Sequence, residues 1–320
     1  MQKILITNAV PADVLAPLAG LAEVIQGPAG GRLMAREDVL RLAPTLQGII
    51  NQAELIVDAE LLDAAPQLKI VANVAIGLDN LDLDLMARRG VWATNVPDAF
   101  VESTADCTIA LILCLLRRIH QADGYVRSGQ WSADGFQPGL WDGVLLAGKT
   151  LGVVGYGRIG RAVARRAEAF DMRVIFHSRS PSEHDGYREL DALMAEADVI
   201  TLHTPLTAAT RHLIDSRTLA QMKPTAFLIN MSRGPVLHEK ALVDALQAGK
   251  IAGAALDVFE FEPEVHPALL RLPNVCLTPH IGGGTRESRA QARRLCAENI
   301  AAVLQGERPL TPVNDPLLGL

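Results

Sequence analysis

The chain of 320 residues is long for one domain and suits two of ordinary size, and its hydrophobic content of 49% allows full-sized cores. Its 30 basic and 36 acidic residues give a net charge of −6 without any long basic block, which argues against a nucleic-acid partner. The longest apolar run, 109–116, is far shorter than the roughly 20 residues of a membrane span, and no signal-peptide pattern opens the chain. We therefore expect a cytoplasmic protein without a membrane partner.

The first part of the chain alternates short apolar strands with helices, which is typical of a parallel sheet covered by helices on both faces. We expect strands at Ile4–Thr7, Glu23–Ile25, Gly48–Asn51, Leu68–Ala72 and Val91–Thr94. We expect helices near Pro11–Ala19, Ala35–Ala43, Asp58–Ala64 and Asp82–Arg89.

Pro97 ends this alternation, and a long helix is predicted over residues 99–118. Residues 124–147 then form a loop-rich stretch that contains Trp131 and Trp141. A stretch of this length without regular structure is usually functional in a compact domain.

The four cysteines show no C-x-x-C pair and no spacing typical of a zinc site. They are Cys107, Cys114, Cys276 and Cys296. We expect reduced thiols that pack as small hydrophobic side chains, and no bound metal.

A G-x-G-x-x-G motif lies between the apolar strand Leu151–Val154 and a helix-periodic segment. Gly155 permits the tight turn, Gly157 lets a pyrophosphate approach the backbone, and Gly160 lets helix and strand pack closely. The helix N-terminus supplies free N–H groups for the anion. The pattern predicts a dinucleotide site formed by Gly155, Tyr156, Gly157, Arg158, Ile159 and Gly160.

The end of the next strand, Arg173–Phe176, bears on the choice between NAD and NADP. NAD-binding sites usually carry an acid about 20 residues after the glycines, which bonds the ribose hydroxyls. Here Ser178, Arg179 and Ser180 follow the strand, and the first carboxylate is Glu183. An arginine and two hydroxyls can bind a 2′-phosphate, so we expect NADP(H), with NAD(H) possible. The alternative is a polar loop with a solvated arginine.

Strand–helix alternation resumes over residues 150–280. Strands are also expected at Val199–His203, Ala226–Ile229, Gly253–Val258 and Val275–Thr278, and helices at Glu239–Gln247 and Arg286–Gln305.

Three polar side chains lie at the carboxyl ends of strands of this second sheet: Arg233, Asp257 and His280. Glu260 and Glu262 lie in the loop after Asp257. Ligands of such sheets bind at the carboxyl ends of the strands. An arginine can clamp a carboxylate and a histidine can donate a proton, which together suit hydride transfer to a carbonyl. Taken singly, each could instead be a structural or solvated side chain.

These motifs together resemble the family of D-isomer-specific 2-hydroxyacid dehydrogenases over essentially the whole chain. The resemblance is carried by Ala75–Asn80, Glu102–Asp106, Gly148–Gly160, Leu202–Leu206, Asn230–Pro235, Asp257–Pro263 and Pro279–Thr285. Within the family, the chain looks most like the NADP-linked glyoxylate, hydroxypyruvate and 2-ketogluconate reductases. Ala75 replaces a common glycine and Asp106 a common glutamate, departures that bear on the substrate rather than on the reaction class.

The resemblance implies a role for each catalytic residue. Arg233 would bind the substrate carboxylate and polarise the ketone, and His280 would be the general acid in reduction and the general base in oxidation. Glu262 would hydrogen-bond the imidazole and keep it protonated near neutral pH. The N–H groups of Ile76 and Gly77 would also hold the carboxylate.

The resemblance likewise implies further cofactor contacts. Asp257 would anchor the nicotinamide carboxamide, and the other contacts would come from Thr104, His203, Thr204, Pro205 and Gly282.

The implied fold is α/β, with two doubly wound parallel-sheet domains and a cleft between them. Residues 1–97 with 286–320 would form a flavodoxin-like substrate domain, and residues 98–285 a Rossmann cofactor domain. The resemblance also implies a homodimer, with an arm over residues 120–147 that brings Trp131 or Trp141 to the neighbour's active site.

The predicted activity is NADPH-dependent reduction of a small 2-oxoacid, of the glyoxylate, hydroxypyruvate or 2-ketogluconate type, to the D-2-hydroxyacid. Two alternatives remain open: a dinucleotide-sensing, corepressor-like binding protein, and an NAD-dependent phosphoglycerate-type dehydrogenase.

Overall fold

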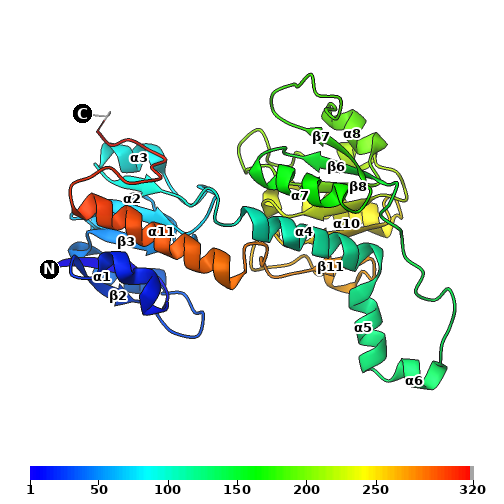
Figure 1. Ribbon diagram of the computed structural model, residues 1–320, viewed down its shortest axis with the longest axis horizontal. Coiled ribbons are helices and arrows are strands. Elements are labelled where there is room, and N and C mark those ends of the chain that lie inside the picture. The colour runs from blue at the N-terminus through cyan, green and yellow to red at the C-terminus, as the bar shows by residue number, and fades with distance from the viewer. Residues whose placement is uncertain (318–320) are drawn as a thin grey trace. The chain divides into compact units, whose positions relative to one another are not determined.

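The computed structural model describes residues 1–317 and contains two compact units (Figure 1). Unit 1 comprises Met1–Phe100 and the chain from Thr285 onward, and unit 2 comprises Val101–Gly284. Residues 318–320, the end of the predicted substrate domain, lie outside the described residues.

Unit 1 is built on a parallel sheet of order β2-β1-β3-β4-β5. Its strands are β1 (Gln2–Ile6), β2 (Ala22–Gln26), β3 (Gly48–Asn51), β4 (Ile70–Asn73) and β5 (Trp92–Thr94). Its helices are α1 (Arg36–Leu42), α2 (Ala59–Ala64), α3 (Leu83–Arg88) and α11 (Arg286–Leu304), with 3-10 helices η1 (Ala12–Leu18) and η2 (Ala43–Thr45). The helix predicted near Pro11–Ala19 is thus a 3-10 helix, and it contains Pro17, which has no N–H for a helical hydrogen bond.

Side chains alternate along each strand and point to opposite faces of this sheet. Each face packs into its own hydrophobic core. Ile4 and Ile6 of β1 belong to the core cluster that contains Ile300 of α11, whereas Leu5 belongs to the cluster that contains Met86 of α3. The C-terminal helix therefore completes a unit that the N-terminal part of the chain begins, and Figure 1 shows α11 lying along this sheet.

Unit 2 is built on a parallel sheet of order β11-β10-β9-β8-β6-β7. Its strands are β6 (Thr150–Val154), β7 (Arg173–His177), β8 (Val199–Leu202), β9 (Phe227–Asn230), β10 (Gly253–Leu256) and β11 (Val275–Leu277). Its helices include α4 (Val101–Leu116), α7 (Arg158–Glu168), α8 (Leu190–Glu196), α9 (Ser216–Leu219) and α10 (Glu239–Gln247), with 3-10 helices η3 (Gly234–Val236) and η4 (Leu269–Arg271). The chain moves outward in opposite directions from β6, so a topological switch point lies between β6 and β8, where such sheets bind ligands.

The segment predicted as loop-rich, residues 124–147, is partly helical. Helix α5 (Ile119–Arg127) extends into it and α6 (Gln130–Asp134) follows. The expectation of an unstructured stretch is therefore wrong for these residues. Two glycines with positive φ, Gly129 and Gly135, follow helices of only nine and five residues, which are hard to recognise from periodicity. No helix among residues 1–317 is long and apolar enough to cross a membrane.

Candidate active site

The glycine motif folds as the sequence analysis predicts for a dinucleotide loop. Gly155 follows β6 with φ of +99°, and a Cβ there would lie 2.7 Å from the backbone of His203. A Cβ on Gly160 would lie 2.2 Å from the carbonyl oxygen of Gly155. Within residues 1–317, by contrast, no atom lies within 4 Å of a Cβ built on Gly157, which precedes α7. The backbone is therefore packed at two glycines and open at the one where a phosphate must approach.

The end of β8 supplies polar atoms beside this loop. Among the described residues, the Thr204 hydroxyl and His203 Nδ1 are buried without a hydrogen-bond partner. His203 Nε2 lies 2.9 Å from the Thr201 hydroxyl, and burial lowers the pKa of His203 to about 3, so its imidazole is neutral. Buried polar atoms in native proteins rarely stay unpaired, so these two mark a ligand position. Together with the open glycine and the N-terminus of α7, they fit a bound dinucleotide.

The other predicted cofactor contacts lie around the same loop. Tyr156 stacks on Phe176 of β7, with ring centroids 3.9 Å apart. After β7, the Ser178 hydroxyl donates to the Ser180 carbonyl at 2.8 Å, and Arg179 is exposed. The loop thus presents hydroxyls and a guanidinium, and no carboxylate, directly after the strand.

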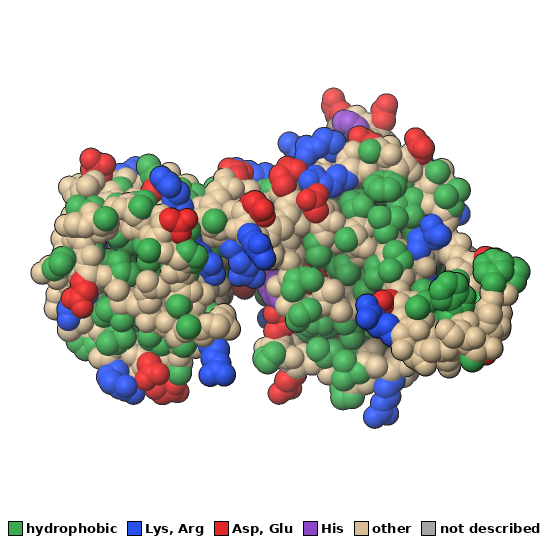
Figure 2. All heavy atoms as spheres, turned by 60° about the horizontal axis from the view of Figure 1, so that its bottom comes forward, with side chains coloured by type: hydrophobic (Ala, Val, Ile, Leu, Met, Phe, Trp, Pro, Cys, Tyr) green, Lys and Arg blue, Asp and Glu red, His purple; other side chains and the backbone are tan. Residues whose placement is uncertain are grey.

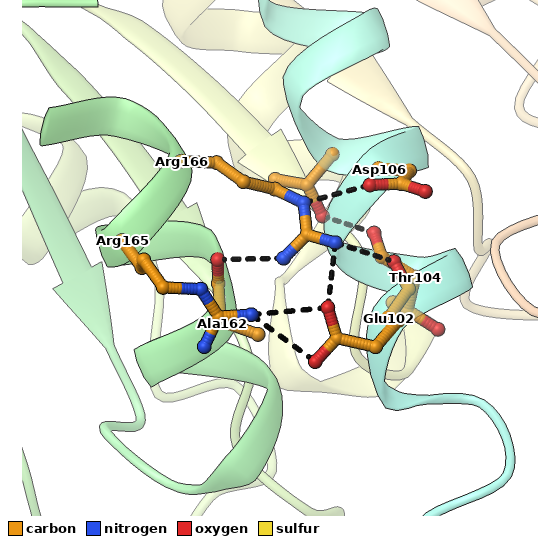
Figure 3. Close-up of polar contacts among 7 residues, drawn as sticks. Glu102, Thr104, Asp106, Ala162, Arg165 and Arg166 are labelled. Carbon is orange, nitrogen blue, oxygen red and sulfur yellow. Dashed lines mark hydrogen bonds and ion pairs between the residues drawn. The ribbon is translucent and has the colours of Figure 1, made fainter. Parts of the chain in front are cut away.

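Helix α7 is held on α4 by a network of ion pairs (Figure 3). Arg166 reaches Glu102 at 2.7 Å and Asp106 at 2.7 Å, and Arg165 reaches Glu102 at 3.0 Å. The hydrogen bond and charge of Arg166, with those of Arg165, lower the pKa of Glu102. Asp106 thus anchors the helix that begins at the glycine loop. Thr104 is buried on α4 between these two acids.

His280 and Glu262 form the predicted pair. His280 Nδ1 lies 2.9 Å from Glu262 Oε2, and the Phe259 N–H donates to Glu262 Oε1 at 3.0 Å. Burial alone would raise the pKa of Glu262, but the hydrogen bond and charge of His280, this N–H group and the charge of Arg233 together lower it. Glu262 is therefore ionised at neutral pH.

The backbone of His280 has a φ of +51°, which side-chain-bearing residues rarely adopt. Asp257, 2% exposed, holds the loop in this conformation. Its Oδ1 accepts from the Thr278 hydroxyl at 2.6 Å and the Ile281 N–H at 2.8 Å, and its Oδ2 accepts from the Gly282 N–H at 2.8 Å. Sequence reasoning missed this positioning role, which no local pattern signals; a contact of Asp257 with the nicotinamide stays a prediction.

Arg233 lies in a loop that is fixed by Asn230 at the end of β9. Asn230 Oδ1 accepts from the Ser232 N–H at 3.1 Å, and its amide donates to the Arg233 carbonyl at 3.2 Å. A Cβ on Gly234 would lie 1.7 Å from the Phe259 carbonyl oxygen, so the Arg233 loop packs directly against the loop that carries Glu262. The structure therefore brings Arg233, Glu262 and His280 together at the carboxyl ends of β9, β10 and β11.

Glu260 lies in the same loop as Glu262, but it contacts His212 and Glu239 and not His280. Its Oε1 lies 2.6 Å from His212 Nε2, and its Oε2 accepts from the Glu239 N–H at 3.0 Å. Glu239 returns a bond, since its Oε2 accepts from the Glu260 N–H at 3.1 Å. The two glutamates thus have separate roles: Glu262 contacts His280, as the resemblance implies, and Glu260, predicted only as a loop residue, holds the loop to the body of unit 2.

In unit 1, the loop after β4 contains the other predicted carboxylate contacts. Asn95 donates to the Ile76 carbonyl at 2.9 Å, and Asn73 donates to the Gly77 carbonyl at 3.1 Å. Within residues 1–317, the N–H groups of Ile76 and Gly77 donate no hydrogen bond. The carbonyls are fixed and the N–H groups are available to a ligand.

Comparison with known proteins shows the family of the chain. The family described as "D-isomer specific 2-hydroxyacid dehydrogenase, NAD binding domain" matches residues 109–282. A glyoxylate reductase of Thermococcus litoralis is 47% identical over 270 residues, which are 82% of this chain and 82% of that protein.

Two solved structures extend the likeness to nearly the full chain. The TT0316 protein from Thermus thermophilus has a TM-score of 0.92 at 39% identity, covering 98% of this chain and 100% of the other. The NADPH-dependent glyoxylate/hydroxypyruvate reductase SMc04462 (SmGhrB) from Sinorhizobium meliloti, in complex with NADP and malonate, has a TM-score of 0.84 at 37% identity, covering 98% and 96%. The chain is an oxidoreductase with a nicotinamide dinucleotide site, and it belongs to the family of D-isomer-specific 2-hydroxyacid dehydrogenases.

Proposed function

We propose that this protein reduces a small, hydrophilic 2-oxoacid, of the glyoxylate or hydroxypyruvate type, to the D-2-hydroxyacid with NADPH. The observation that carries the proposal is the placement of Arg233, Glu262 and His280 at three neighbouring strand ends of the sheet that holds the dinucleotide loop. The relative named glyoxylate reductase and the neighbour bound to NADP and malonate support the substrate and cofactor classes.

The reaction adds a hydride to the C2 carbonyl carbon and a proton to its oxygen. The nicotinamide supplies the hydride when it is bound. Glu262 holds Nδ1 of His280, which leaves Nε2 to donate the proton to the carbonyl oxygen. Arg233 binds the substrate carboxylate and stabilises the negative charge that develops on the carbonyl oxygen. In oxidation, His280 takes the proton back.

We also expect the free N–H groups of Ile76 and Gly77 to bind a carboxylate oxygen of the substrate. Two backbone donors on a fixed loop select an anion without adding charge. An Ile76→Pro substitution removes one donor and should raise KM for the 2-oxoacid while the KM for the cofactor stays unchanged. Ile76→Val is the matched control, because it keeps the N–H group.

The preference for NADP rests on the loop after β7. Arg179 is exposed, and within the described chain its guanidinium forms no hydrogen bond or ion pair, so it is available to a 2′-phosphate. Arg179→Ala should lower kcat/KM for NADPH by at least about tenfold, the loss of a charged hydrogen bond, and leave kcat/KM for NADH nearly unchanged. Arg217→Ala, which removes an exposed arginine paired with Asp191, serves as the control. Equal losses with both cofactors would contradict the assignment.

We further propose a homodimer formed through the arm that α5 and α6 begin. Figure 2 shows hydrophobic side chains gathered on this arm, where Trp131, Phe136 and Leu145 are 51%, 84% and 72% exposed. Trp141 is engaged within its own chain, with Arg118 stacked over it at 4.8 Å, so Trp131 is the better candidate to reach a neighbour. Phe136→Asp should shift sedimentation toward monomer, and an unchanged dimer would refute the role of the arm.

A further inference from the structure

Two thiols and an imidazole meet in unit 2 in a cluster that the reductase site does not use. Cys114 lies near the end of α4, His120 at the start of α5, and Cys276 in the middle of β11. The two sulfur atoms are 3.7 Å apart, and Cys114 Sγ lies 3.8 Å from His120 Nδ1. One ligand atom from each of the three residues lies within 4.8 Å of the others.

Two of the three separations are close to those of a tetrahedral zinc site. With Zn–S bonds of about 2.3 Å and Zn–N bonds of about 2.0–2.1 Å, tetrahedral angles give an S···S separation of about 3.8 Å and an S···N separation of about 3.6 Å. The observed separations of 3.7 and 3.8 Å match both. Thiolate and imidazole are ligands that Zn²⁺ favours, and two thiolates neutralise its charge.

The cluster also contains a buried nitrogen atom that has no hydrogen-bond partner in the described part of the chain. Cys276 is buried, and within residues 1–317 His120 Nε2 is buried without a hydrogen-bond partner. The imidazole has therefore lost water on one side and gained only a weak thiol contact on the other. A metal bond at Nδ1 would replace this weak thiol contact with a strong one.

The three ligands sit on regular elements that are tied to one another. Cys276 is paired with Ala255 in the sheet, and the Gln121 amide of α5 donates to the Pro273 carbonyl just before β11. A cavity of about 190 Å³ is lined in part by His120.

We propose that Cys114, His120 and Cys276 bind one Zn²⁺ ion per chain, with a non-protein fourth ligand. The ion would clamp α4, α5 and β11 together, which is a structural role separate from reduction. The sequence analysis expected no metal because the ligands show no zinc-type spacing, but α5 and β11 bring distant residues to Cys114.

The test is to titrate tag-free, reduced protein with Zn²⁺ against a chromogenic chelator and, separately, with Co²⁺ followed by absorbance. We expect one equivalent of each ion, a thiolate-to-cobalt charge-transfer band with the intense visible bands of a tetrahedral site, and a higher Tm with Zn²⁺. Cys276→Ser and His120→Ala should each weaken binding by more than the roughly 10- to 100-fold typical of losing an outer-shell partner. Cys107→Ser, on the same helix α4, should bind normally.

Alkylation of the wild-type protein provides a second measurement, which does not depend on the variants folding. Zn²⁺ should protect Cys114 from alkylation, read by mass spectrometry, and leave the labelling of Cys107 unchanged. The proposal is overturned if no one-to-one binding occurs, if binding survives both Cys276→Ser and His120→Ala, or if Zn²⁺ fails to protect Cys114.

Discussion

Substitution of Glu262 by glutamine tests how much the negative charge of Glu262 contributes to proton transfer by His280. The change keeps the size of the side chain and removes its negative charge, 2.9 Å from His280 Nδ1. Two unit charges about 4 Å apart attract by about 1 kcal/mol in water and about 4 kcal/mol at the effective dielectric near a protein surface. The side chains of His280 and Glu262 are 49% and 36% exposed, so solvent screening places the pair at about 1–3 kcal/mol.

This energy corresponds to a rate effect of roughly 5- to 150-fold, and its size depends on pH. In reduction His280 gives up a proton, and an ionised Glu262 stabilises the imidazolium. The hydrogen bond and charge of His280 lower the pKa of Glu262, so this carboxylate is ionised above about pH 4 in the wild type. In Glu262→Gln the reduction rate should therefore be lower than in the wild type wherever Glu262 is ionised, and the two profiles should converge as the pH falls through the pKa of Glu262. Oxidation, in which His280 gains a proton, should lose activity over the same pH range.

The assay is the initial rate of cofactor oxidation or reduction as a function of pH, with Glu264→Gln as a control in the same loop. Glu264 is exposed and its carboxylate makes no hydrogen bond or ion pair among the described residues, so its profile should match the wild type. A loss of the same size at every pH would indicate a structural role for Glu262 alone. An unchanged profile would refute the reasoning about the pair.

Three further predictions concern residues whose substitution should change the free energy of unfolding, and urea unfolding measures each change. Gly234→Ala places a Cβ against the Phe259 carbonyl and should lower the free energy of unfolding by at least about 1–3 kcal/mol, with a loss of kcat. Asp257→Ala leaves two backbone N–H groups without an acceptor, at roughly 1–3 kcal/mol each, whereas a stable variant would contradict the loop-holding role. Burial acts to raise the pKa of Asp198, but Lys223 and a backbone N–H lower it, so its contribution is present above about pH 4 and lost as the pH falls below that. Asp198→Asn should flatten the decrease in stability below about pH 4, and an unchanged acid limb would contradict the pairing.

The sequence predicts the sheets better than the segments between them. Buried parallel strands are short, continuous apolar runs, so Gly48–Asn51 is predicted with its observed bounds, and so is helix Glu239–Gln247, whose apolar side chains recur at helical spacing. The short helices of the arm escaped prediction because glycines interrupt them before a period is established.

In the candidate site, too, some features follow from a local sequence pattern and others do not. The glycine loop and the residues at strand ends can be predicted, because the order of strand and motif dictates where they lie. The positive φ of His280, the bonds from Asp257 that hold its loop, and the bracing by Glu260 depend on residues that meet only in the folded unit. The thiol–imidazole cluster is the extreme case, since Cys114 and Cys276 are far apart in the sequence and 3.7 Å apart in space.

The most direct test of 2-oxoacid reduction at His280 is the initial rate of hydroxypyruvate and glyoxylate reduction by the wild type and by His280→Ala, with NADPH and NADH side by side. We expect NADPH to be oxidised faster than NADH, hydroxypyruvate to yield the D-hydroxyacid, and His280→Ala to lower kcat by roughly 100- to 10,000-fold. Near-normal turnover by His280→Ala, or no oxidation of either cofactor by the wild type, would contradict it.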